Sequence, residues 1–245
     1  MSGLDACCST PPVVANYKAK GETIKIGDRD CYVVGDKSSK RAIIYIYDIF
    51  GYHPNAYQGA DILSSKGFRV FIPDFFNGNP LVPSDLGNKT RLMNLIKERV
   101  DWNDVVLPNL NKVREYLQEK ENITKVGVLG FCWGAKMATL ALNDETKFYQ
   151  SAALIHPSFP SIEDFENAQG PICLLPSKDE GPMKDMYQKL ESKEFYDKCF
   201  YHYFDDMPHG FCAARGDWEN SDIERLRACE ALGFCAEFFN KTVTV

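Results

Sequence analysis

The sequence predicts an α/β fold with a mostly parallel central sheet and helices on both of its faces. Short apolar runs such as AIIYIY (42–47) and KVGVLG (125–130) are typical of strands buried on both sides. Helix-like stretches of crossover length separate these runs along the chain. The length of 245 residues, with 44% hydrophobic and 25% charged side chains, suits one globular domain. We therefore expect a single domain over residues 1–245, in which residues 1–20 are an irregular lead-in.

The first half of the chain predicts a strand pair, two further strands and two helical stretches. TIKI (23–26) and CYVVG (31–35) flank the turn sequence GDRD and read as paired strands. The run at 42–47 is the first buried strand, residues 53–66 form a helix, and FRVFIPD (68–74) is the next strand. Residues 77–89 are rich in Gly, Pro, Asn and Ser and predict a loop. A charged helical stretch follows from residue 90 to about 120.

The second half repeats the alternation of strand and helix. The strand at 125–130 runs directly into a helix over WGAKMATLAL (133–142). The remaining expected strands are AALIH (152–156), ICLLP (172–176) and FYHYF (200–204), and the remaining helices cover residues 183–194 and 219–240. In such sheets ligands bind beyond the carboxyl ends of the strands, so functional residues are expected in the loops there.

Composition and targeting signals exclude several classes of partner. A net charge of −6 provides no basic surface for nucleic acid or anionic lipid. The N-terminal MSGLDACCST has neither the basic nor the apolar region of a signal peptide, and no stretch is long and apolar enough to span a bilayer. Nine cysteines without a C-x-x-C pair are typical of free thiols. We expect a cytoplasmic or nuclear protein that acts on a small molecule, with no nucleic-acid or membrane partner.

The segment GFCWG (130–134) contains the candidate nucleophile. Gly130, Cys132 and Gly134 fill the G-x-S-x-G frame of a nucleophile elbow, with cysteine in place of serine. An elbow is a tight turn from strand to helix, and its flanking glycines are needed because larger side chains do not fit there. The predicted strand before Cys132 and helix after it agree with that geometry. The alternative is a core cysteine that is buried for packing alone.

A nucleophilic thiol needs a histidine as base, and the chain has four histidines. In this fold class the order is nucleophile, acid, histidine. His53 and His156 stand in the wrong order or at the wrong strand end, and His202 lies inside a predicted strand. His209, in DDMPHGF, follows the last strand at the carboxyl edge and is the predicted base. A surface-loop histidine is the alternative for His209.

The acid that orients the base is expected after the preceding strand. In ICLLPSKDEGPM this position belongs to Asp179, which lies between the strand and the next helix. Glu180 is adjacent and competes for the same role. Asp179 could instead be the N-terminal cap of the helix.

One segment contains residue types that bind metals. The segment 202–212 contains His202, Asp205, Asp206, His209 and Cys212. Their spacing does not give the two compact ligand pairs of a structural zinc site, and a strand turns alternate side chains apart. We therefore expect no metal site.

Five motifs together resemble the dienelactone hydrolase family, whose members are also called carboxymethylenebutenolidases. They are YDIFG (47–51), PDFF (73–76), GFCWG (130–134), SKDEG (177–181) and PHGF (208–211), and the resemblance extends over residues 23 to about 240. It implies an α/β-hydrolase fold and hydrolysis of small lactones or esters without a cofactor. It also implies a Cys-Asp-His triad made of Cys132, Asp179 and His209.

The resemblance implies further site residues. The backbone N–H groups of Ile49 and Trp133 are expected to form the oxyanion hole. Asp48 stands where family members often carry a glutamate that holds the resting thiol; a shorter aspartate could instead cap the turn. Arg215 stands where arginines of related enzymes bind a substrate carboxylate, with a solvated arginine as the alternative.

A sulfur nucleophile limits the classes of substrate that we expect. A thiolate is a strong nucleophile and also a good leaving group, which favours substrates with a stable leaving group such as enol lactones, aryl esters or thioesters. The sequence thus predicts a lactone or ester hydrolase that forms an acyl-thioester. One alternative is a redox-active or deglycase-type cysteine, although deglycases carry a histidine where Trp133 follows the cysteine here. The other is a hydrolase-fold protein that binds a ligand without turnover.

Overall fold

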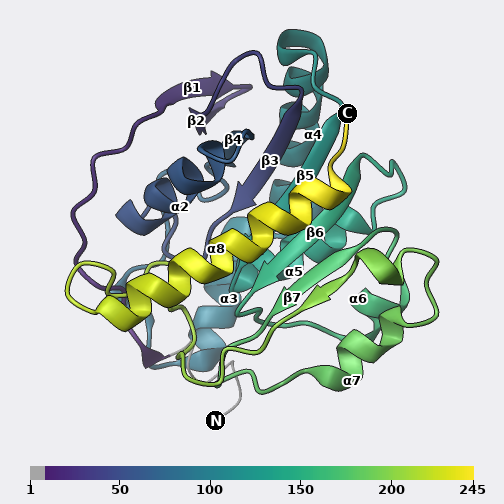
Figure 1. Ribbon diagram of the computed structural model, residues 1–245. Helices are drawn as coiled ribbons and strands as arrows, with labels where there is room; N and C mark the ends of the chain where they lie inside the picture. The colour runs from purple at the N-terminus through teal and green to yellow at the C-terminus, as the bar shows by residue number, and fades with distance from the viewer. Residues whose placement is uncertain (1–8) are drawn as a thin grey trace.

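The computed structural model describes residues 9–245, and within them the strands form one eight-stranded sheet (Figure 1). The order across the sheet is β1-β2-β4-β3-β5-β6-β7-β8, with β1/β2 and β2/β4 antiparallel and all other neighbours parallel. The strands are β1 (Glu22–Ile26), β2 (Arg29–Val34), β3 (Arg41–Ile46), β4 (Arg69–Pro73), β5 (Lys125–Phe131), β6 (Tyr149–Ile155), β7 (Ile172–Leu175) and β8 (Phe200–Tyr201). The predicted mostly parallel sheet is confirmed.

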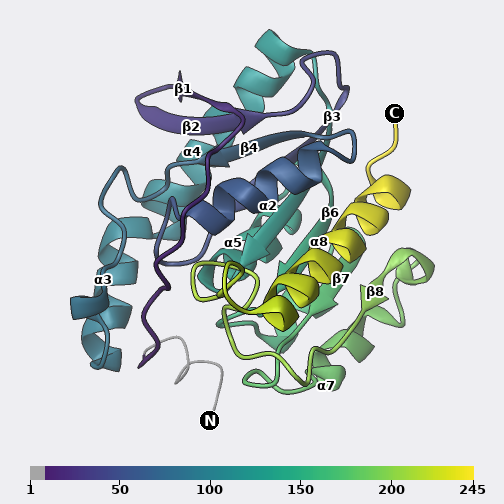
Figure 2. The ribbon, with the colours of Figure 1, turned by 60° about the vertical axis from the view of Figure 1, so that its left-hand side comes forward.

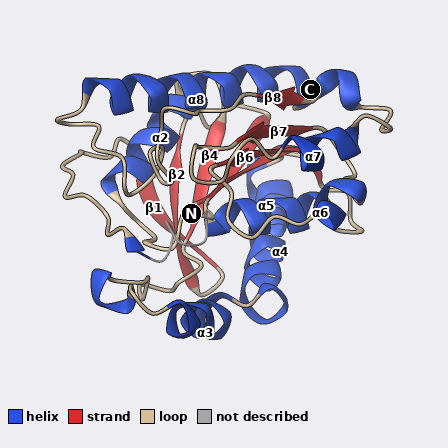
Figure 3. Ribbon diagram, turned by 90° about the horizontal axis from the view of Figure 1, so that it is seen from below, coloured by secondary structure: helices blue, strands red, loops and turns tan. Residues whose placement is uncertain are grey.

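Helices cover both faces of this sheet (Figure 3). On one face lie α2 (Pro54–Ser64) and α8 (Asp222–Thr242), and on the other α3 (Lys89–Val100), α4 (Leu107–Tyr116) and α5 (Trp133–Leu142). The short helices α6 (Ile162–Glu166) and α7 (Lys184–Tyr187) lie beside β7 (Figure 1). Strands covered in this way have no polar face, which is why β3, β4 and β5 are almost entirely buried.

Four elements differ from the sequence prediction. The helix expected over 183–194 shortens to α7, followed by a 3₁₀ turn over Gln188–Leu190. The helical stretch expected from 90 to about 120 breaks at Asp101, whose extended backbone ends α3 and whose carboxylate accepts the N–H groups of Asn103 and Asp104. The strand expected over 200–204 shortens to β8, with one further bridge between Phe204 and Ser177. The short helix α6 was not predicted. The break at Asp101 was not predicted because an aspartate inside a charged run is compatible with a helix, whereas here Asp101 caps a new turn.

The carboxyl ends of β3, β5, β6 and β7 meet at one edge of the sheet, and the loops that follow them carry the candidate site. Residues 10–20 form neither helix nor strand, as expected, and run from this edge to β1 (Figure 2). The Val13 N–H donates to the carbonyl of Ala214, and Tyr17 donates its hydroxyl to Asp61. Residues 1–8 of the predicted lead-in lie outside the described residues.

Candidate active site

The backbone at Cys132 has the strained geometry of a nucleophile elbow. Cys132 lies between β5 and α5 with φ 54° and ψ −117°, a conformation that non-glycine residues rarely adopt. A Cβ atom on Gly130 would lie 2.1 Å from the Gly134 carbonyl oxygen. A Cβ atom on Gly134 would lie 2.3 Å from the carbonyl oxygen of Ile46. Both glycines are therefore required where helix α5 begins against β3 and β5.

His209 reaches the same place from the loop between β8 and α8. Its Nδ1 lies 2.6 Å from Oε1 of Glu180, and both side chains are completely buried. The second carboxylate oxygen of Glu180 accepts the Ser177 N–H at 2.6 Å, which fixes its orientation. Glu180 is thus held between its own loop and the imidazole.

Where the sequence predicted Asp179 to orient the ring, the structure places Glu180 at Nδ1. Asp179 is close by but accepts the backbone N–H of His209 at 2.7 Å. The longer glutamate side chain reaches the ring, whereas the aspartate anchors the loop that carries it. Both acidic residues therefore contact His209, one at its side chain and the other at its main chain.

The electrostatic surroundings of His209 favour its charged form. Burial lowers the pKa of His209, but the charge of Cys132, a hydrogen bond with Cys132, and the bonded Glu180 carboxylate together outweigh burial and raise that pKa to about 10. Since Nδ1 faces Glu180, Nε2 is the ring nitrogen that remains for the sulfur. By the same attraction the imidazolium favours the thiolate form of Cys132.

The two predicted oxyanion groups come from the start of α5 and from the loop after β3. Trp133 is the first residue of α5, so its N–H has no partner within the helix. Ile49 is completely buried in the loop after β3, which is the neighbour of β5 in the sheet. This position agrees with the expected oxyanion hole, whose function remains a prediction.

The carboxylate of Asp48 fixes the loop after β3, which contains Ile49. One oxygen accepts the Phe50 N–H at 2.9 Å and the other accepts the Ala214 N–H at 3.2 Å. The side chain is buried and both of its oxygens bind main-chain groups. This arrangement agrees with the turn-capping alternative for Asp48, and it also ties the loop after β3 to the segment that follows His209.

Arg215 is buried and is not the solvated arginine of the alternative interpretation. Its Nε donates to the carbonyl of Thr10 at 2.6 Å, and its guanidinium carbon lies 4.7 Å from the centroid of the Phe50 ring. Its positive charge is close enough to lower the pKa of His156. The guanidinium thus contributes to the field of the site, and binding of a substrate carboxylate remains a prediction.

Two residues in the loop after β6 lie beside Cys132 and His209: Ser158, which the sequence did not single out, and His156, which was considered only as the base and set aside. His156 directly follows the carboxyl end of β6, and its ring centroid lies 5.1 Å from that of His209. The Ser158 hydroxyl lies 3.4 Å from the sulfur of Cys132. Their signal was the polar sequence HPS directly after a buried apolar strand, at the sheet edge where ligands bind.

His156 is a buried neutral imidazole. Neither ring nitrogen has a hydrogen-bond partner among the described residues. Burial, together with the positive charges of His209 and Arg215, holds the pKa of His156 well below its usual range. Its ring packs against Phe131 and Phe211.

Comparison with known proteins identifies the family. The dienelactone hydrolase family matches residues 30–243. The chain belongs to the dienelactone hydrolase family. It is similar to an uncharacterized AIM2 family protein from Schizosaccharomyces pombe, with 36% identity covering 96% of this chain and 98% of the relative. It is also similar to the human carboxymethylenebutenolidase homolog, with 26% identity covering 92% of each chain.

Solved structures agree with this family at the level of the fold. A dienelactone hydrolase from Anabaena variabilis superposes with a TM-score of 0.62 at 14% identity, covering 93% of this chain and 99% of that chain. The resemblance predicted from the motifs and the α/β-hydrolase fold are thus confirmed. Membership in the dienelactone hydrolase family also confirms the enzyme class, a hydrolase that acts on ester bonds.

Two of the residues considered as metal ligands have other partners in this dienelactone hydrolase fold. His202 packs on the rings of Phe204 and Phe234, and Asp206 pairs with Arg227. Within residues 9–245 no group of three or more His, Cys, Asp or Glu side chains is arranged to hold a metal ion. Over the same residues, no helix has the length and apolar character needed to cross a bilayer.

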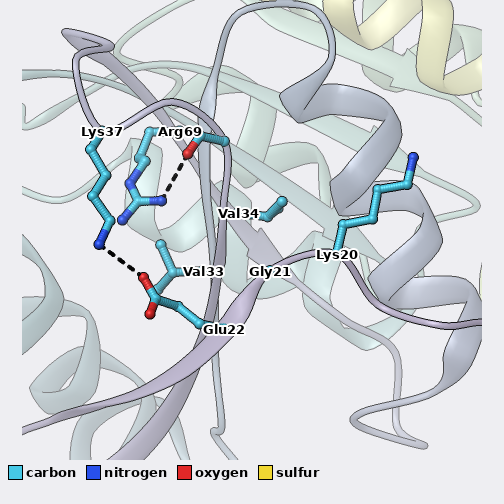
Figure 4. Close-up of a pocket in the computed structure, with 8 residues that line it drawn as sticks. Lys20, Gly21, Glu22, Val33, Val34, Lys37 and Arg69 are labelled. Atoms are coloured by element: carbon cyan, nitrogen blue, oxygen red, sulfur yellow. Dashed lines mark hydrogen bonds and ion pairs between the residues drawn. The ribbon is translucent and has the colours of Figure 1, made fainter.

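A hollow of about 310 Å³ lies at the opposite edge of the sheet (Figure 4). It is lined by residues at the start of β1, the end of β2 and the start of β4, including Glu22, Lys37 and Arg69. Its charged groups bind each other: Lys37 pairs with Glu22, and Arg69 donates to the Gly35 carbonyl and pairs with buried Glu121. The residues that the sequence predicted for the hydrolase site lie instead at the carboxyl edge of the sheet.

Proposed function

We propose that this chain hydrolyses small lactones or activated esters without a cofactor, through an acyl-thioester on Cys132. The observation that carries the proposal is the strained Cys132 next to the buried pair of His209 and Glu180. A buried carboxylate beside an imidazole, which in turn lies beside the nucleophile, is the arrangement that activates a serine or cysteine for acyl transfer.

In the first half-reaction the sulfur of Cys132 adds to the carbonyl carbon of the substrate. The carbonyl oxygen gains negative charge, which the N–H groups of Ile49 and Trp133 would stabilise. The intermediate then collapses: the bond from carbon to the leaving oxygen breaks, and the His209 imidazolium gives its proton to that oxygen. The acyl group remains on sulfur as a thioester.

The second half-reaction regenerates the enzyme. Neutral His209 takes a proton from water, whose oxygen attacks the thioester carbon. Collapse of this intermediate breaks the carbon–sulfur bond and releases a carboxylic acid. The thiolate and the imidazolium are then restored.

The structure supports Glu180, rather than the predicted Asp179, as the acid of this triad. Glu180 holds Nδ1–H and leaves Nε2 for the sulfur and the attacking water. Its negative charge stabilises the imidazolium in both half-reactions. Asp179 would act indirectly by fixing the main chain of His209.

The chemistry of sulfur limits the substrates. A thiolate leaves a tetrahedral intermediate more readily than an alkylamine or a simple alkoxide, so the leaving group of the substrate must be more stable than these. Enol lactones, aryl esters and thioesters meet this condition, and amides do not. The proposal therefore specifies a class of activated acyl compounds.

Turnover of p-nitrophenyl acetate tests the nucleophile. Cys132→Ala should lower kcat/KM by about 1,000-fold or more, because the covalent route is lost. Cys229→Ala is the matched control, since Cys229 is an exposed free thiol, and should turn over like the wild type. Equal activity of the folded Cys132→Ala variant would refute the proposal, whereas a folded wild type without turnover would favour a redox or binding role.

A trapping experiment tests the base. In His209→Ala the thiol can still be acylated slowly at pH ~9, where more of it is ionised, but water lacks a base for deacylation. Mass spectrometry should therefore find an acetyl group on the peptide with Cys132 at higher occupancy than in the wild type. His202→Ala, the control, should not accumulate it; accumulation there instead would identify His202 as the base.

We further propose that the protein works in a reducing compartment, the cytosol or nucleus. The described cysteines, Cys31, Cys132, Cys173, Cys199, Cys212, Cys229 and Cys235, are all free thiols. A thiol nucleophile also requires an environment that does not oxidise it.

A further inference from the structure

Ser158 contacts Cys132 at two points. Its hydroxyl oxygen lies 3.4 Å from the sulfur, and its N–H donates to the Cys132 carbonyl at 2.9 Å. The side chain is buried, with a relative exposure of 2%. Ser158 comes from the loop after β6, whereas His209 comes from the loop after β8, so the sulfur is contacted from two separate elements.

The loop that carries Ser158 is held in an unusual conformation. His156 and Phe159, on either side of it, have φ of 37° and 62°. Non-glycine residues keep such angles only where the surrounding structure enforces them. The His156 N–H donates to Leu175 O on the neighbouring strand β7, and Ser158 itself is bonded to the elbow. The hydroxyl is thus placed at the sulfur by a constrained main chain.

The charged groups around the sulfur bear on the direction of this hydrogen bond. Glu180 is bonded to His209, both oxygens of Asp48 accept main-chain N–H groups, and His156 is kept neutral beside His209 and Arg215. The imidazolium of His209 favours an ionised sulfur. At 3.4 Å either the hydroxyl or a thiol could be the donor, but a thiolate has no hydrogen to donate, so with ionised sulfur the donor is the hydroxyl of Ser158.

We propose that Ser158 is a positioning residue for the nucleophile, whose hydroxyl donates to the Cys132 thiolate and stabilises it before attack. A hydrogen bond to a charged group is among the stronger ones in proteins, and it increases the share of the ionised form. The same bond withdraws electron density from sulfur, so each thiolate is somewhat less nucleophilic. The inference rests on the proposed role of Cys132 as nucleophile.

Alkylation of Cys132 by iodoacetamide measures both effects without any substrate turnover. The rate is followed from pH 5 to 10 by mass spectrometry of the peptide that contains Cys132, which separates it from the other cysteines. In Ser158→Ala the midpoint of the rate profile should rise by about one pH unit, as expected for loss of one charge-assisted hydrogen bond. The plateau rate at high pH should rise about threefold, because nucleophilicity increases with thiol pKa.

Ser151→Ala is the matched control. Ser151 is a completely buried serine of β6 whose hydroxyl lies 2.7 Å from that of Thr242, so its loss removes a buried hydrogen bond without touching the site. Its midpoint and plateau should equal those of the wild type. A wild-type midpoint for Ser158→Ala, or an equal shift in Ser151→Ala, would overturn the inference.

A second variant keeps the test available if Ser158→Ala does not fold. Ser158→Cys, reduced and assayed anaerobically, places a weaker donor of similar shape at the sulfur, and the midpoint should rise by less than one unit. An unchanged midpoint in this variant would contradict the inference. Alkylation requires only the thiol, so it reports whether Ser158 stabilises the thiolate even if the wild-type protein has no esterase activity. Absence of esterase activity would refute the proposed function alone.

Discussion

Glu180→Gln tests which of two adjacent acids orients the base. In the structure one oxygen of Glu180 faces Nδ1 of His209 and the other accepts the Ser177 N–H, each at 2.6 Å. Glutamine has one oxygen and one NH₂ group, so it satisfies only one of these donors. If its NH₂ faces Nδ1, the ring proton moves to Nε2, and the nitrogen that should accept protons is blocked. If its NH₂ faces Ser177, the NH₂ group and the Ser177 N–H are both donors, and both are buried without an acceptor.

Both outcomes have a magnitude that follows from these contacts. The wrong tautomer in a serine protease triad lowers kcat by about 10⁴-fold, and a similar loss, about 10³- to 10⁴-fold in kcat/KM, is expected here. Loss of the carboxylate charge also lowers the pKa of His209 from its value of about 10, which disfavours the thiolate–imidazolium pair. An unsatisfied buried donor would cost about 1–3 kcal/mol of folding stability in addition.

Asp179→Asn is the matched comparison. Its carboxylate accepts only the main-chain N–H of His209, and the oxygen of asparagine can accept the same bond. The loss in kcat/KM for p-nitrophenyl acetate should therefore stay below about tenfold. Circular dichroism would verify that both variants are folded. A severe loss in Asp179→Asn together with a mild one in Glu180→Gln would show that Asp179 is the acid, and would refute the assignment from contacts.

Three further perturbations test the surroundings of the site. Gly134→Ala should lower the urea midpoint strongly or prevent folding, because the new Cβ would lie 2.3 Å from the Ile46 carbonyl oxygen; a wild-type midpoint would contradict the elbow geometry. Asp48→Asn leaves one of two main-chain N–H groups without an acceptor and should cost about 1–3 kcal/mol in urea unfolding, with reduced kcat; unchanged stability would show that these bonds matter little. The folded-state pKa of His156 lies below its unfolded value, so the unfolded chain binds a proton below about pH 6.5 and the folded chain does not. Wild-type stability should therefore fall more than that of His156→Phe between pH 6.5 and 5, by at most about 1.6 kcal/mol, and parallel curves would show that His156 titrates normally.

The features that sequence predicted are those with a local cause. Apolar runs indicate the buried strands. Two glycines, which leave space for the main-chain oxygens of Gly134 and Ile46, indicate the elbow. The loop placement of His209 followed from its position after the last strand and between Pro208 and Gly210. Each of these signals lies within a few residues, and so did the motifs that indicated the family.

The features that sequence missed depend on how separate loops meet. Asp179 and Glu180 both follow β7, and chain order cannot tell which carboxylate turns toward the ring. The structure separates them by side-chain length and by the Ser177 N–H that orients Glu180. Ser158 reaches the sulfur only because the loops after β5 and β6 adjoin, and His156 was set aside because the search was for one histidine following an acid.

The two buried histidines of the site differ in charge because their neighbours differ. His209 faces Cys132 and Glu180, and these two negative groups outweigh the cost of burying a positive ring. His156 packs on Phe131 and Phe211, with His209 and Arg215 as its charged neighbours, and both of these positive groups oppose a second proton. When His209 releases its proton to the leaving group, repulsion on His156 weakens, yet burial still disfavours its charged form. We therefore expect His156 to stay neutral through both half-reactions, so that the proton balance of the proposed mechanism involves His209 alone.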